Sequence, residues 1–145
     1  EREYLQQSIS QNLGVKVELN TVGDYQMLAN ERDNKNYDIF VGGWFSDYND
    51  PLDFLNIMKT GVYDSYGLYS NSEYDSLIDS LTGENDNAKR LEIYQKLEDL
   101  LVAQDCGVAP LYYSDKHYYY QNWVKDFYTS SFGASQELYR ASVQK

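Results

Sequence analysis

The sequence predicts an α/β fold in which a mixed sheet is flanked by helices. Helical and strand-like segments alternate along the first half of the 145 residues, an order typical of layered folds with parallel strands. The second half ends in tyrosine-rich segments, and tyrosine favours strands. Hydrophobic residues make up 42% of the chain and charged residues 24%, which are the proportions of a folded protein with a core. No repeat or linker divides it, so we expect a single domain over residues 1–145.

Two helices and two strands are predicted in the first part of the chain. Residues 2–13 carry apolar side chains at every fourth position, which predicts a helix that ends at Gly14. Residues 15–19 alternate apolar and charged side chains and predict a half-buried strand. Asp24 can cap a short helix that follows it. The apolar run 38–44 predicts a buried strand.

Three helices are predicted next. Asp50, Pro51 and Asp53 suit the N-cap, first and third positions of a helix. Residues 72–81 begin with Ser72 as the expected cap and carry an apolar stripe. The longest predicted helix covers residues 88–105, with one face formed by Leu91, Tyr94, Leu97 and Leu101, and with Gly107 after its end.

The remaining chain predicts strands. Residues 108–113 and 117–123 are strand-like runs joined by a tight turn at 114–116, and residues 137–143 predict a last strand. Alternation would place tyrosines on both faces of the first two strands, so that one face packs and the other is open. These tyrosines are either core and cross-strand partners or a stacking platform for a ligand.

Charge and composition exclude several functions. The net charge is −11 and no Lys/Arg patch is present, so we expect no binding of nucleic acid or of anionic membranes. No apolar run is long enough to span a bilayer, so we expect no direct membrane insertion by this segment. The single cysteine, Cys106, permits no internal disulfide.

Metal binding and catalysis are also disfavoured. The loop that begins at Asp47 resembles a calcium loop, but Leu52 replaces the required glycine and Met58 replaces the bidentate glutamate. One histidine, His117, and one cysteine do not supply a zinc site, and no nucleophile elbow surrounds Ser46. We therefore expect no metal, no cofactor and no enzyme activity.

The stretch 43–48 is the strongest candidate for a binding site. It follows a predicted strand, where ligands of open α/β sheets bind. If it is extended, Gly43, Phe45 and Asp47 share one edge that can pair with a peptide main chain. Trp44 would then offer a flat wall, and Asp47 could meet an ammonium group. Alternatively, Asp47 only fixes the loop by hydrogen bonds and Trp44 belongs to the core; the residues leave both interpretations open.

The same stretch resembles the signature of the peptide-binding solute-binding proteins of ABC importers, the family 5 extracellular solute-binding proteins. The matching residues are Trp44, Asp47, Tyr48, Asp50, Pro51, Phe54 and Leu55. Further similar segments are 14-GVKVEL, 69-YSNSEYDSLID and 89-KRLEIYQKLEDLLVAQDCGVAPLYY. Their order and spacing agree with the family over nearly the whole chain.

The resemblance implies a two-lobed, periplasmic-binding-protein-like (type II) receptor outside the cytoplasm, as a cell-surface lipoprotein or in the periplasm. The chain would be a single partial domain, the C-terminal lobe fragment of a larger protein. Such receptors capture an oligopeptide ligand and deliver it to a membrane permease. Asp47 would pair with the peptide's amino group, the backbone at Gly43 and Phe45 would bond its main chain, and Trp44 would line a pocket. Tyr48 completes the expected ligand-binding set.

Two alternatives remain from the sequence. The same scaffold can bind a non-peptide solute such as a sugar or a metal chelate. A more distant alternative is a glycoside hydrolase that uses Asp47 with another carboxylate.

Overall fold

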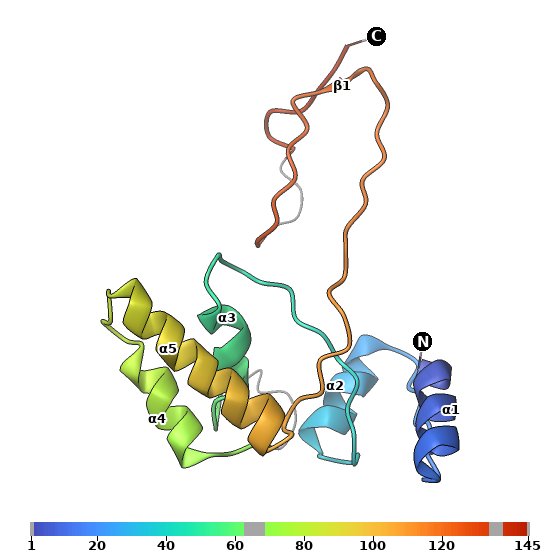
Figure 1. Ribbon diagram of the computed structural model, residues 1–145. Helices are drawn as coiled ribbons and strands as arrows, with labels where there is room; N and C mark the ends of the chain where they lie inside the picture. The colour runs from blue at the N-terminus through green and yellow to red at the C-terminus, as the bar shows by residue number, and fades with distance from the viewer. Residues whose placement is uncertain (1, 63–68, 134–137, 145) are drawn as a thin grey trace. The chain divides into compact units, whose positions relative to one another are not determined.

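The computed structural model describes residues 2–62, 69–133 and 138–144 (Figure 1). The chain divides into two compact units, Glu1–Gly42 and Gly43–Lys145. The boundary between them falls at the start of the predicted binding stretch.

The first unit contains two helices, α1 (Arg2–Leu13) and α2 (Tyr25–Asp33), as the sequence predicts. Gly14 follows α1 with φ of +66°, a left-handed conformation in which glycine has no Cβ penalty. The side chain of Asp24 accepts a hydrogen bond from the backbone N–H of Met27 at 2.8 Å and caps α2.

The strands predicted over residues 15–19 and 38–44 are not present. Neither segment pairs with a strand among the described residues, and the Val17 carbonyl accepts instead from the side-chain amide of Gln6 at 2.8 Å. Ile39, which was expected in a buried strand, is 74% exposed. A strand forms only when a second strand satisfies its backbone hydrogen bonds, so an apolar pattern alone does not produce one.

The second unit is built on a helical layer. Its helical segments are α3 (Leu52–Leu55), η1 (Asn56–Met58), α4 (Ser72–Ser80), α5 (Asn87–Glu98) and η2 (Asp99–Gln104). The segment η2 continues α5 as a π-helix, with the N–H of Asp105 bonded to the carbonyl of Leu100 five residues earlier at 2.9 Å. The predicted helices therefore exist, and the longest is extended by a π turn.

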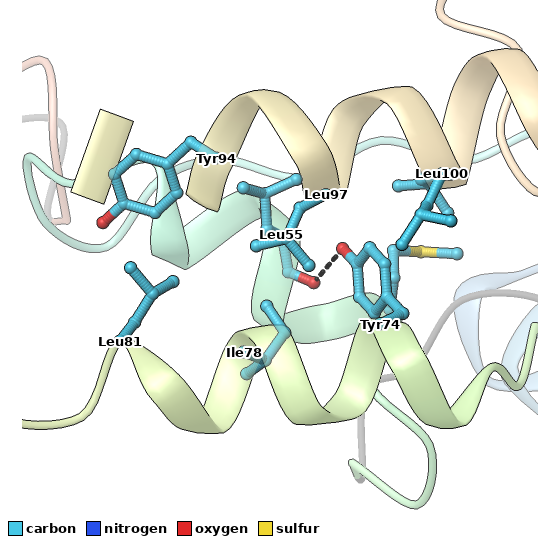
Figure 2. Packing of buried hydrophobic residues seen from close by; sticks show 9 residues of the cluster. Leu55, Tyr74, Ile78, Leu81, Tyr94, Leu97 and Leu100 are labelled. Atoms are coloured by element: carbon cyan, nitrogen blue, oxygen red, sulfur yellow. Dashed lines mark hydrogen bonds between the residues drawn. The ribbon is translucent and has the colours of Figure 1, made fainter. Parts of the chain in front are cut away.

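The hydrophobic core lies between these helices. Figure 2 shows side chains from α3, α4 and α5 meeting across it. The buried residues are Leu55, Met58, Tyr74, Ile78, Leu81, Tyr94, Leu97, Leu100 and Leu101. The phenol of fully buried Tyr74 donates to the carbonyl of Leu55 at 2.8 Å, so that α4 is bonded directly to α3 (Figure 2).

Three details differ from the sequence prediction. Asn71, not Ser72, caps α4, because its side chain accepts from the N–H groups of Glu73 and Tyr74. Leu91 is exposed, and Leu100 lies in the core instead. The left-handed residue after η2 is Cys106, with φ of 51°, rather than Gly107.

The tyrosine-rich segments do not form the two predicted strands. Within the described residues the strands are β1 (Val124–Lys125) and β2 (Ser142–Val143), an antiparallel pair with Val124 opposite Val143. The last predicted strand is thus present in shortened form, and its first residue, 137, lies outside the described residues. Tyr113 and Tyr119 are 96% and 95% exposed, because no described strand covers them. His117 is exposed as well.

None of the helices in the described parts of the chain is long and apolar enough to cross a bilayer.

Gly107 is required by close packing. A Cβ added there would lie 2.6 Å from a ring carbon of Tyr69 and 3.1 Å from Leu101. Gly107→Ala should therefore lower the free energy of unfolding by about 1–3 kcal/mol, the usual range for an overpacked site. Urea unfolding measures this loss. Gly23→Ala is the matched control, because its Cβ would meet only the Met27 sulfur at 3.9 Å. Equal effects of the two substitutions would contradict the steric explanation.

Candidate ligand-binding site

The loop that precedes α3 is held by the carboxylate of Asp53. Asp53 is buried, with 6% of its surface exposed. Its Oδ2 accepts from the indole N–H of Trp44 at 2.9 Å and from the backbone N–H of Asp47 at 3.0 Å. One carboxylate on the first turn of a helix thus fixes both a side chain and a backbone group of the preceding loop.

Asp50 joins the same loop to α5. Its Oδ1 accepts from the backbone N–H of Leu52, the first residue of α3, at 2.8 Å. The N-cap position, which was predicted for Asp50, is occupied by Pro51, so Asp50 lies one residue before it. The Tyr94 phenol donates to Oδ1 at 2.6 Å, and the Arg90 guanidinium bonds Oδ2 at 2.7 Å. Arg90 also donates to the carbonyls of Leu81 and Glu84, each at 3.2 Å, so the guanidinium ties the loop to the α4–α5 turn.

This network changes the acidity of its members. Burial is the largest influence on Asp50 and would raise its pKa, but the hydrogen bonds from Tyr94 and Leu52 and the charge of Arg90 outweigh it. The pKa of Asp50 is therefore lowered from 3.8. Burial, followed by the hydrogen bond and charge of Asp50, raises the pKa of Tyr94 to about 12. Near neutral pH the pair is a carboxylate and a phenol that donates to it.

A further hydrogen bond connects the loop to the C-terminal part of the chain. The N–H of Gly133 donates to the carbonyl of Ser46 at 2.9 Å. Gly133 has φ of +61°, and a Cβ there would lie 3.3 Å from the Asp47 carbonyl. Glycine is favoured at this position for both reasons. The middle of the loop is thus supported from two sides, by α3 and by the segment at Gly133.

The predicted backbone edge is partly available. The N–H and C=O groups of Gly43 and Phe45 form no hydrogen bonds within the described residues. The N–H of Asp47, expected on the same edge, is taken by Asp53. The Phe45 side chain is 62% exposed, and the Lys116 ammonium lies 4.4 Å from its ring centroid. The edge that remains open therefore consists of Gly43 and Phe45.

The side chain of Asp47 is exposed, and its carboxylate forms no hydrogen bond or ion pair with any described residue. Its backbone, in contrast, is fixed by Asp53. The loop thus presents an acid whose main chain is positioned and whose side chain is unused.

Trp44 and Tyr48 have different environments. Trp44 is half-buried and its N–H is used by Asp53, so it belongs neither to the core nor to a free surface. Tyr48 is exposed, and its pKa is raised by burial first and then by the charges of Asp53, Asp50 and Asp47. It is therefore a neutral hydroxyl donor near neutral pH.

The sequence reasoning missed the residues that support this loop. The sequence analysis assigned Asp53 only to the start of a helix. The available signal for its contact with Trp44 was an acid at the third position of the predicted helix, nine residues after the tryptophan. Arg90 and Tyr94 are 40 and 44 residues from Asp50, so no local pattern indicates their contacts with it. The same holds for Gly133.

The arrangement suits binding rather than acid–base chemistry. The two acids nearest Asp47 along the chain, Asp50 and Asp53, already accept hydrogen bonds from Arg90, Tyr94, Trp44 and the backbone. Among the described residues, no three His, Cys, Asp or Glu side chains gather as metal ligands. Within the described part of the chain, the loop presents the unbonded backbone groups of Gly43 and Phe45 and the exposed carboxylate of Asp47.

Comparison with known proteins identifies the family of the chain. Residues 1–65 match the family described as "Bacterial extracellular solute-binding proteins, family 5 Middle". The oligopeptide-binding protein OppA of Bacillus subtilis (strain 168) is 32% identical over 126 residues, which cover 86% of this chain and 22% of that protein. The chain belongs to the family 5 bacterial extracellular solute-binding proteins.

Solved structures of similar proteins show the same fold. The crystal structure of the substrate-binding domain of an oligopeptide ABC transporter from Bacillus anthracis superimposes with a TM-score of 0.84 at 30% identity, covering 99% of this chain and 28% of that one. The pheromone receptor PrgZ, solved to show its mode of peptide binding, gives a TM-score of 0.80 at 27% identity over 99% of this chain and 27% of that one. The predicted fold class, one lobe of an α/β solute-binding protein, is confirmed.

The chain spans about a fifth of the length of the curated relatives and about a quarter of the solved ones.

The ionic link at Asp50 predicts a pH-dependent stability. Because its pKa is depressed in the folded state, the stabilisation is fully present above the unfolded value of about 3.9 and is lost as pH falls through the folded value. Asp50→Asn should lower the free energy of unfolding by about 1–2 kcal/mol at pH 6, and the difference from wild type should shrink as the pH falls below the unfolded pKa and through the lowered folded pKa. Urea unfolding across this pH range measures it. The exposed Asp38→Asn should show no such trend, and a gap independent of pH would contradict the ionic explanation.

Asp53 is expected to control the environment of Trp44. In a Trp123→Phe background, Asp53→Ala should shift the emission of Trp44 to longer wavelength and lower the free energy of unfolding by about 2–3 kcal/mol, because two donors lose one acceptor. Asp53→Asn is the matched control, since its amide oxygen can occupy the Oδ2 position and accept both bonds. Unchanged emission in the alanine variant would show that Asp53 does not hold the indole.

Proposed function

We propose that this chain is a fragment of the C-terminal lobe of an extracytoplasmic oligopeptide receptor, a cell-surface lipoprotein or periplasmic protein that serves the permease of an ABC importer. The receptor binds oligopeptides without chemical conversion. Bound peptides are then released to the membrane permease. The names of the relatives, which are binding proteins and an oligopeptide transporter domain, support this class of function.

The proposal rests on the different roles of two aspartates, Asp53 and Asp47, in the loop. Asp53 holds the backbone of Asp47 and the ring of Trp44, whereas the Asp47 carboxylate is exposed without a partner among the described residues. An ammonium group is the natural partner of such an acid, and the free N-terminus of a peptide supplies one. Asp47 is therefore the clamp for the peptide amine.

The other predicted residues support the same ligand. The open backbone groups of Gly43 and Phe45 suit main-chain pairing with an extended peptide, which is independent of peptide sequence. Trp44 contributes a ring face beside them, because its polar N–H is already bonded to Asp53. Tyr48, a neutral phenol close to Asp47 along the chain, can donate to a peptide carbonyl.

The clamp is tested in the complete receptor that contains this chain. Asp47→Asn should weaken binding of short peptides with a free amine by about 10–100-fold, the loss of one charge-assisted hydrogen bond, as measured by calorimetry. Binding of the same peptides after N-acetylation should change less than about 2-fold. Asp38→Asn, at an exposed aspartate outside the site, is the matched control. Equal losses of affinity for free and acetylated peptides would contradict the proposed role of Asp47.

The same experiment separates the alternatives. A receptor that is stabilised against heating by sugars or metal chelates, and by no peptide, would favour a non-peptide solute. Hydrolysis of a glycoside that disappears in Asp47→Asn would favour the hydrolase.

A further inference from the structure

A hollow of about 330 Å³ lies beside the open backbone edge. It is lined by Phe45 together with two segments from the C-terminal half of the chain, and all of these belong to the second unit. The lining residues are Phe45, Ser114, Asp115, Lys116, Tyr118, Thr129, Ser130 and Ser131. Because Phe45 contributes to both the hollow and the edge, a ligand along the edge passes the mouth of this hollow.

The cation of the hollow is Lys116. Its ammonium lies 4.4 Å from the centroid of the Phe45 ring, a cation–π contact that fixes the charge above the ring. The ammonium forms no ion pair or hydrogen bond within the described residues, and this includes its neighbour Asp115. An ammonium has three donors, so all three stay available to a ligand.

The rest of the lining is rich in hydroxyl groups. Within the described part of the chain, the side chains of Ser114, Thr129 and Ser131 form no hydrogen bonds, whereas the hydroxyl of Ser130 is used by Phe132. Hydroxyl donors around an ammonium recognise a carboxylate by charge and hydrogen bonds together. Because the chain has a net charge of −11, a cationic site at Lys116 also differs in sign from the overall electrostatic field of the chain.

The geometry points to a carboxylate-binding subsite at Lys116, which rests on the proposed function and sharpens its substrate class. Asp47 would hold the ammonium of a bound peptide while Lys116, over the ring of Phe45, takes a carboxylate. The ligands preferred are peptides with an acidic side chain near the amino end, or short peptides whose C-terminal carboxylate reaches the same place.

The spacing along the loop limits which carboxylate can reach. Phe45 and Asp47 are two residues apart, at most about 7 Å between Cα atoms in an extended chain. A bound peptide covers the same distance with about two residues. The acidic side chain should therefore belong to one of the first three residues, and a C-terminal carboxylate reaches Lys116 only in a dipeptide or tripeptide.

The test uses calorimetry on the complete receptor with two sets of peptides. The first set consists of C-terminally amidated tetrapeptides of alanine with Glu or Gln placed at position one, two or three. The second compares Ala-Ala-Ala with its amide. We expect the wild type to bind the best Glu peptide about 5–10-fold more tightly than its Gln partner, or to prefer the free tripeptide to its amide by a similar factor. The two arms distinguish a side chain from a C-terminus as the source of the carboxylate.

Lys116→Met should abolish this preference, while Lys116→Arg should keep most of it. Lys125→Met, a loss of the same charge from an exposed position of β1, should leave it unchanged. Tight peptide binding with equal affinity for Glu and Gln, and for acid and amide, would overturn the subsite alone. Absence of binding to every peptide would overturn the peptide-receptor function and the subsite together. A preference that survives in Lys116→Met would assign it to other residues and overturn the role of Lys116.

Discussion

The buried carboxylate of Asp53 is the interaction on which the candidate site depends. It lies on the first turn of α3 and accepts from the indole of Trp44 and from the backbone of Asp47. Without it, two donors would lose their acceptor inside a partly buried loop, which is more unfavourable than losing an exposed hydrogen bond. Because Asp53 holds the loop, the Asp47 carboxylate is not needed for that purpose, and it is exposed without a partner among the described residues.

Asp53 can act in this way because α3 is itself firmly held. Leu55 belongs to the core, and its carbonyl accepts from the buried phenol of Tyr74 on α4. At the other end of α3, Asp50 is bonded to Arg90 and Tyr94 on α5. The loop thus sits on a short helix that both longer helices fix, and this rigidity is what a binding residue needs to keep its geometry.

The sequence predicts those features whose causes are local. Helices α1, α2, α4 and α5 follow from periodic apolar residues and from caps such as Asp24, because a helix satisfies its own backbone. The predicted strands are wrong because a strand needs a second strand to satisfy its backbone, and these segments have none among the described residues. The segments concerned are 15–19, 38–44, 108–113 and 117–123.

The candidate site also divides into features with local causes and features with distant ones. Asp47 was singled out by its position after a strand-like run, whereas the links through Arg90, Tyr94 and Gly133 join residues tens of positions apart and have no local pattern.

The charges of Asp47 and Lys116 beside the open edge would favour one orientation of a bound peptide. Main-chain pairing with Gly43 and Phe45 alone would accept a peptide in either orientation, because backbone groups repeat in both. With an acid at Asp47 and the Lys116 cation over the ring of Phe45, two residues earlier, one orientation of the proposed ligand would be favourable and the other would place like charges together. Both charges are exposed to solvent in this chain, where an ion pair contributes about 1 kcal/mol or less. The discrimination becomes large only when a second surface closes over the ligand and removes water, because the same pair interacts more strongly at lower dielectric. In the proposed receptor, orientation and affinity would therefore be controlled by different parts: the loop at Gly43–Asp47 would select the direction of the peptide, and closure around it would determine how tightly the peptide is held.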